Sequence, residues 1–130
     1  MPNEFWSESE VAAVVEDYFE MFRCEMADQD YNKAEHNRHL RERLNNRTKS
    51  SVELKHQNIS AVLREINLPY LPGYKPKKNY QGLLKEGVER HMIANPELRE
   101  QMMRWSRRSP DVPPVVSILI FAGLGLAMVG

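Results

Sequence analysis

The stretch SESEVAAVVEDYFEMFRCEM, residues 7–26, decides the fold because it joins a helix start to a long apolar face. Ser7 and Glu10 have the spacing of a capping box, in which each side chain accepts a hydrogen bond from the other residue's backbone N–H. The apolar residues that follow recur at intervals of three and four positions: Val11, Val14, Val15, Tyr18, Phe19, Phe22 and Met26. Such spacing places them on one face of a helix. We therefore predict a helix over residues 8–27 that buries this face.

Four more helices are predicted downstream from the same kinds of pattern. Asn32 and Asn95 stand where N-cap residues are expected, and Ser50 with Glu53 has the spacing of a second capping box. The predicted helices cover residues 33–44, 51–66, 81–93 and the stretch that begins at Pro96. Strand patterns are weak everywhere in the chain. The predicted fold class is all-α, a small bundle of about five helices within residues 1–108.

Length and composition limit what the chain can be. Its 130 residues are 42% hydrophobic, which is typical of one globular domain. The single cysteine, Cys24, excludes an intramolecular disulfide and a cysteine-based zinc cage. No phosphate-loop or dinucleotide motif is present, so no cofactor is predicted. The acidic N-terminus does not have the pattern of a secretory signal, which favours a cytoplasmic location.

The C-terminal part of the chain is predicted to be separate from the helical module. Residues 109–114, SPDVPP, are typical of a linker, and residues 115–130 form an apolar tail without a charge. As a helix the sixteen-residue tail would span about 24 Å, less than the ~30 Å of a bilayer's hydrocarbon core. Membrane anchoring is therefore disfavoured. Two other interpretations stay open: an interior segment of a longer parent protein, or a peptide that packs on the helical module.

Charge is segregated along a chain whose net charge is zero. Residues 1–30 contain nine acidic residues and one basic residue, whereas residues 31–80 contain eleven basic and four acidic residues, a net charge of +7. A patch of one sign attracts partners of the opposite sign. The basic middle therefore favours a polyanion such as DNA as partner. Alternatively, the acidic first helix packs against the middle and neutralises it.

Residues 33–66 have the pattern of a helix-turn-helix, with two helices joined by the short polar turn at residues 45–49. In that motif the second helix enters the major groove, where Lys, Gln and Asn side chains hydrogen-bond to base edges. The candidate phosphate contacts are Lys33, Arg38, Arg41, Arg47 and Lys49, and the candidate base contacts are Ser51, Lys55, Gln57 and Asn58. The alternative is an ordinary antiparallel helix pair with a basic outer face.

A second candidate for nucleic-acid contact is the loop GYKPKKNY, residues 73–80, in which basic and aromatic residues alternate. Lys75, Lys77 and Lys78 could follow a phosphate backbone while Tyr74 or Tyr80 stacks on a base. More often, tyrosines next to prolines pack a loop onto its own domain.

Catalytic chemistry is not predicted. His36 and His39 share a helical face and could form a metal set with His56, but the stretch is predicted to be continuous helix and lacks a recognisable ligand pattern. Acidic pairs such as Glu16 and Asp17 are interpreted as solvated helix charges. We therefore expect a protein that is not an enzyme.

Three stretches resemble a known group of proteins. They are YNKAEHN at 31–37, SVELKHQNISAVL at 51–63, and GYKP at 73–76 with NYQ at 79–81. Together they resemble the N-terminal helical module of multidomain bacterial restriction and defence-like proteins, which often precedes an HNH-type nuclease domain. The resemblance implies an accessory, DNA-directed role, with catalysis supplied by a parent nuclease domain or a partner protein.

Overall fold

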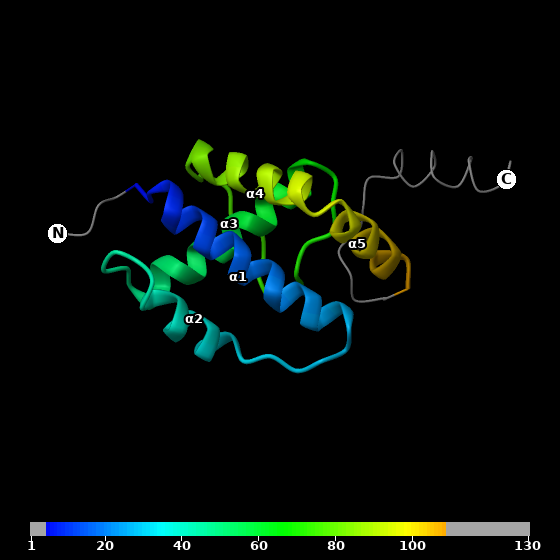
Figure 1. Ribbon diagram of the computed structural model, residues 1–130, viewed down its shortest axis with the longest axis horizontal. Coiled ribbons are helices and arrows are strands. Elements are labelled where there is room, and N and C mark those ends of the chain that lie inside the picture. The colour runs from blue at the N-terminus through cyan, green and yellow to red at the C-terminus, as the bar shows by residue number, and fades with distance from the viewer. Residues whose placement is uncertain (1–4, 109–130) are drawn as a thin grey trace, which may run out of the picture.

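The computed structural model describes residues 5–108, which form five α-helices (Figure 1). The helices are α1 (Glu8–Met26), α2 (Lys33–Arg41), α3 (Lys49–Glu65), α4 (Gly82–Ala94) and α5 (Pro96–Arg108). No strand occurs within these residues, so the prediction of a small all-α bundle is confirmed. The predicted linker at 109–114 and the predicted tail at 115–130 lie outside the described part of the chain.

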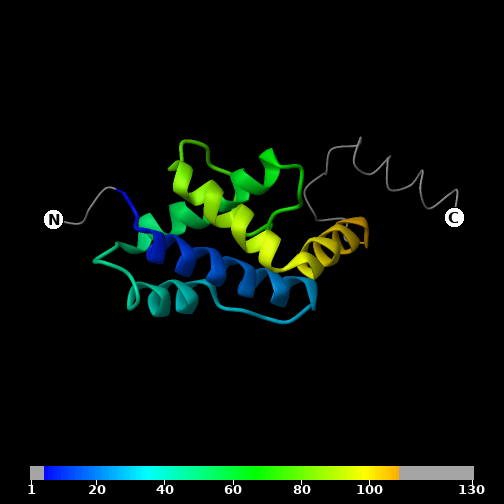
Figure 2. The same ribbon diagram turned by 45° about the horizontal axis from the view of Figure 1, so that its top comes forward.

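Helix α1 is the centre of the bundle, because it contacts all four other helices. Figures 1 and 2 show α2 along one side of it, α4 along another and α5 beside its C-terminal end. The fully or nearly fully buried apolar side chains of α1 are Val11, Ala13, Val14, Val15, Tyr18, Phe19, Met21 and Phe22. The apolar spacing in residues 7–26 therefore predicted the face that forms the core.

The first two helix starts agree with the sequence patterns, and the third does not. The capping box of Ser7 and Glu10 is present, and the Asn32 side chain accepts from the backbone N–H of Glu35. Helix α3, however, begins two residues earlier than expected, because the Thr48 side chain accepts from the N–H of Ser51. The predicted capping box at Ser50 is therefore wrong: threonine is also a favourable N-cap, and the turn before α3 places Thr48 at that position.

Helix α2 ends at Arg41, three residues before its predicted end. The following backbone N–H groups bond to carbonyls three residues back rather than four, as in Leu44 to Arg41. Asn46 then adopts a left-handed conformation with a φ of 55°, which asparagine tolerates better than most residues. This turn directs Arg47 back toward α1.

The hydroxyl of Tyr18 connects three parts of the fold. Its oxygen accepts a hydrogen bond from the backbone N–H of Leu71 at 2.8 Å and lies 2.8 Å from the hydroxyl oxygen of Ser60. All of these groups are buried. The proline-rich segment between α3 and α4 is thereby held against α1 and α3, which fixes where the basic loop at residues 73–80 can lie.

Helix α4 approaches α1 closely at Gly87. A Cβ atom at this position would lie 2.6 Å from a methyl carbon of Val11, which is closer than carbon atoms pack. Glycine is therefore required here by helix–helix contact, in spite of its low helix propensity.

Candidate nucleic-acid interface

Arg47 does not lie on an outer surface, and its predicted role as a phosphate contact is wrong. Its side chain is only 5% exposed and forms an ion pair with the buried carboxylate of Glu10 on α1, with Nε 2.9 Å from Oε2. The guanidinium also donates to the carbonyl of Phe5 and lies over the ring of Trp6. Arg47 is thus an internal counter-charge for the acidic first helix.

The Glu10 carboxylate has an unusually low pKa in this site. The hydrogen bond from Arg47 lowers its pKa from 4.5 to about 2, helped by backbone N–H groups of Asn45 and Ser7 and opposed by burial. A carboxylate that accepts several N–H donors is stabilised in its charged form. The positive charge of Arg47, one of the basic residues in 31–80, is therefore neutralised by packing against α1, as the second interpretation of the charge pattern predicted.

The predicted base contacts on α3 are mostly used within the protein. Asn58 is 1% exposed and its amide donates to the carbonyl of Lys77, so its predicted contact with a base is wrong. The Ser51 hydroxyl donates to the carbonyl of Thr48 in the first turn of α3. Its Oγ is therefore already bonded inside the helix.

Lys55 and Gln57 are half-buried on the same helix. The ammonium of Lys55 lies over the Trp6 ring, and its pKa is lowered by burial and by the charge of Arg47. Because residues 58–63 of α3 are buried, this helix is an interior element of the bundle. Apart from Arg64 and Glu65 at its C-terminal end, its exposed residues lie in the first two turns, which is less than a recognition helix presents to a major groove.

Three of the other four predicted phosphate contacts lie at the surface. Lys33, Arg38 and Lys49 are exposed, and none of them forms an ion pair within residues 5–108. Arg41 is half-buried and its Nε donates to the Asn37 side chain at 2.9 Å.

Three lysines lie on the loop between α3 and α4, and a fourth, Lys33 at the start of α2, contacts the same loop. The Lys33 ammonium donates to the carbonyl of Gly73 at 2.8 Å and lies 4.5 Å from the ring centre of Tyr74. A few residues on, the backbone N–H of Lys77 donates to the carbonyl of Gln57, which fixes the loop on α3. We call the exposed side chains of Lys33, Lys75, Lys77 and Lys78 the lysine surface.

The tyrosines of this loop are packed onto the protein. Tyr74 is 3% exposed, its ring lies 4.8 Å from that of His56, and its hydroxyl donates to the sulfur of Met21. Tyr80 is half-buried and its hydroxyl donates to the Glu65 carboxylate. Stacking of Tyr74 on a base is thereby excluded, and the alternative of a loop packed on its own domain is confirmed for it.

Two of the three candidate metal-binding histidines meet at an aspartate. The Asp17 carboxylate lies 2.7 Å from Nδ1 of His36 and 3.0 Å from Nε2 of His56. Asp17 and His56 are buried, and His36 lines an open cavity of about 320 Å³ together with Glu20, Glu35 and His39. The prediction that Asp17 is a solvated helix charge is wrong, because its carboxylate is buried and bonded to two imidazoles.

This histidine–aspartate cluster joins α1, α2 and α3. No group of three or more His, Cys, Asp or Glu side chains within the described residues is placed to bind a metal ion. Asp17 could have been noticed in the sequence, because Val14 and Met21, three positions before and four after it, are both core residues. An acid between them lies on the buried side of the helix.

The comparisons with known proteins add nothing to this picture. No family model, no curated protein and no solved structure matches the chain. The resemblance to a restriction and defence-like helical module therefore stays a prediction. Within residues 5–108, none of the helices has the length and apolar character of a membrane span.

Proposed function

We propose that the protein is a non-catalytic accessory module that binds duplex DNA through its phosphate backbone at the lysine surface. The observation that carries the proposal is the contrast between Arg47, which pairs with an acid inside the bundle, and Lys33, Lys75, Lys77 and Lys78, which form no ion pair within residues 5–108. Exposed lysines that form no ion pair leave a positive potential that attracts phosphates.

The mode of binding differs from a helix-turn-helix. The side chains that would have read bases are buried, half-buried or bonded within the protein, whereas the lysine surface lies on a loop and at the start of α2. Phosphate contacts fix the position of a protein on DNA but carry no sequence information. We therefore propose binding with little base specificity, in which any sequence preference comes from a partner.

The experiment is a salt titration of binding to a labelled duplex of about 20 base pairs, followed by fluorescence anisotropy. Each phosphate contact contributes about 0.9 to the slope of log affinity against log salt. The triple variant Lys75→Gln/Lys77→Gln/Lys78→Gln should therefore weaken binding and lower that slope by about 2.7.

A matched control removes three positive charges elsewhere. Arg90, Arg99 and Arg107 are exposed on α4 and α5, and their triple glutamine variant has the same net charge as the lysine variant. It should retain most of the affinity and slope. Equal loss in both variants, or no salt-dependent binding of the native chain, would overturn the proposal. Tighter binding of a single strand than of the duplex would reassign the surface to single-stranded nucleic acid.

A second candidate function is a helical adaptor for a partner protein, with the apolar tail at residues 115–130 as its contact segment or membrane tether. These residues lie outside the described part of the chain. The adaptor would become the better proposal if the native chain failed to bind DNA at low salt.

A further inference from the structure

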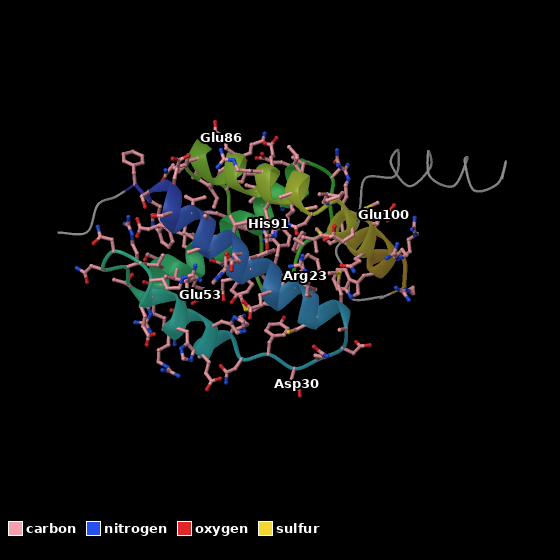
Figure 3. The ribbon with its side chains drawn as sticks, in the orientation of Figure 1. Arg23, Asp30, Glu53, Glu86, His91 and Glu100 are labelled. Carbon is pink, nitrogen blue, oxygen red and sulfur yellow. The ribbon has the colours of Figure 1, made fainter. Side chains whose placement is uncertain are left out.

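A second cationic feature lies at the other end of α1, in a pocket between α1 and α5. Its volume is about 370 Å³, near the lower end of the range for small-ligand sites. The side chains that form it include Arg23 and Met26 from α1 and Gln101, Arg104, Trp105 and Arg108 from α5. Figure 3 shows Arg23 on the half of α1 that approaches α5.

Three arginines thus line one concavity, and no acidic residue among residues 5–108 lines it with them. Arg104 has a single acidic neighbour, Glu100, at 3.9 Å, and both of these side chains are more than half exposed. Such an exposed ion pair is weak, so Glu100 neutralises little of the charge of Arg104. Arg23 and Arg108 form no ion pair with any residue between 5 and 108. The pocket therefore has a local excess of positive charge.

Helix capping does not account for these arginines. Both helices end near the pocket, and basic residues are common in last turns because they complement the helix dipole. In α1, however, the terminal carbonyls of Arg23, Cys24 and Glu25 already accept backbone N–H groups from residues 27–29. Within residues 5–108, Arg108 donates only through Nε, to the carbonyl of Arg104 at a long 3.4 Å, so its two terminal nitrogens are not used by the described part of the chain.

The wall of the pocket suits a ligand that is not purely ionic. Trp105 is 8% exposed and is fixed by an edge-to-face contact with Phe22, with ring centres 5.0 Å apart. Met26 adds a flexible apolar side chain beside it. A rigid aromatic edge and a thioether next to three guanidiniums favour a ligand with one anionic and one planar or apolar part.

We propose that this pocket binds a phosphate monoester joined to a small planar group, such as a nucleoside monophosphate. The guanidinium forks of Arg23, Arg104 and Arg108 would hold the phosphate oxygens, because arginine matches the geometry of phosphate with paired N–H donors. The apolar part would lie against Met26 and Trp105. The same chemistry is present at the 5′-phosphate end of a nucleic acid, so the experiment separates the two sources.

The test is calorimetric titration of the full chain with adenosine monophosphate, adenosine and inorganic phosphate. Saturable binding of the nucleotide is expected with a dissociation constant of about 1 mM or lower, with weaker binding of phosphate and none of adenosine. The triple variant Arg23→Gln/Arg104→Gln/Arg108→Gln should weaken nucleotide binding on the order of 100-fold, since hydrogen bonds to charged groups are strong. Trp105→Phe keeps the packing on Phe22 and should weaken binding only several-fold.

Two control variants show whether a loss of nucleotide binding is specific to the pocket between α1 and α5. The triple glutamine variant of Arg90, Arg99 and Arg107 removes as much charge but no lining residue, and should bind the nucleotide as the native chain does. The triple variant of Lys75, Lys77 and Lys78 should also bind it normally, so failure of the DNA proposal and of this one can be told apart.

Two outcomes would overturn the inference. One is the absence of saturable nucleotide binding; the other is an equal loss in the pocket variant and the arginine control while both keep the native circular dichroism spectrum. A 5′-phosphorylated dinucleotide that binds much more tightly than its 5′-hydroxyl form and than the mononucleotide would assign the pocket to nucleic-acid ends.

Discussion

Two acidic residues of α1 face the basic middle of the chain, and different kinds of hydrogen-bond donor stabilise their buried carboxylates. Glu10 meets four N–H donors: those of Ser7 and Arg47 on Oε1, and those of Asn45 and Arg47 on Oε2. Asp17, seven residues later, meets two imidazoles, one on each oxygen. Both carboxylates are buried and both join α1 to the segment that follows it.

The two sites differ in whether their hydrogen-bond donors can also become acceptors. A guanidinium and a backbone N–H donate under all ordinary conditions and never accept. A neutral imidazole donates through one nitrogen and accepts through the other, and it can exchange these roles. The Glu10 site therefore requires a carboxylate, whereas the Asp17 site can adapt to another polar group. The predictions below test this contrast.

The largest effect is expected for Glu10→Gln. The amide has one accepting oxygen, so its NH₂ group would face two donors, and the Arg47 guanidinium would be left buried without its counter-charge. Breaking a buried ion pair from one side costs about 3–5 kcal/mol. Urea unfolding, followed by circular dichroism, should show a loss of that size in the free energy of unfolding.

Glu16→Gln is the matched control for this substitution. Glu16 lies on the same helix and is exposed, so its replacement should change the free energy of unfolding by no more than about 0.5 kcal/mol. If both substitutions had effects of similar size, the Glu10–Arg47 pair would not be a determinant of stability.

The next largest effect is expected in the pH dependence of the free energy of unfolding, through Glu10. The pKa of Glu10 is about 2 in the folded protein and 4.5 ordinarily. Its contribution of about 3 kcal/mol is therefore fully present above pH 4.5 and is lost as the pH falls from 4.5 to 2. Measured between pH 5 and 2, the difference in stability between the native chain and Glu10→Gln should shrink. A difference that does not change with pH would contradict the low pKa.

Local patterns predicted the fold well. The capping box at Ser7 and the apolar spacing of α1 depend on residues within one or two turns of each other, so a single stretch of sequence contains the whole signal. The misplaced start of α3 shows the limit of this reasoning. Thr48 and Ser50 are both good caps, and only the path of the preceding turn decides between them.

The polar contacts that define the candidate sites could not be predicted in the same way. Arg47 and Lys75 are equally basic in the sequence, yet one is buried against Glu10, 37 residues away, and the other is exposed. Which cation is neutralised depends on how α1 packs against the turn after α2, a contact between distant parts of the chain. Net charge alone overestimates the surface that is left for a polyanion.

The smallest effect is expected for Asp17→Asn. The tautomers of His36 and His56 determine which imidazole adapts to this substitution. With an ionised Asp17, His36 carries its proton on Nδ1 and His56 carries its proton on Nε2, because both nitrogens must donate. Nδ1 of His56 is buried and has no partner among the described residues. His36 is different, because its side chain is 21% exposed and borders the cavity.

Asparagine can satisfy both imidazoles if one of them becomes the acceptor of its NH₂ group. His36 should be the one that changes, since its proton can move to Nε2 and meet water, whereas a proton on Nδ1 of His56 would be a buried donor without a partner. The cluster then loses only charge assistance, so the cost should be about 1–2 kcal/mol, well below that of Glu10→Gln. Nitrogen-15 NMR of the imidazoles should show the exchanged tautomer at His36 and no change at His56. A loss of stability as large as that of Glu10→Gln, or a tautomer change at His56, would mean that the two acidic sites are equally rigid.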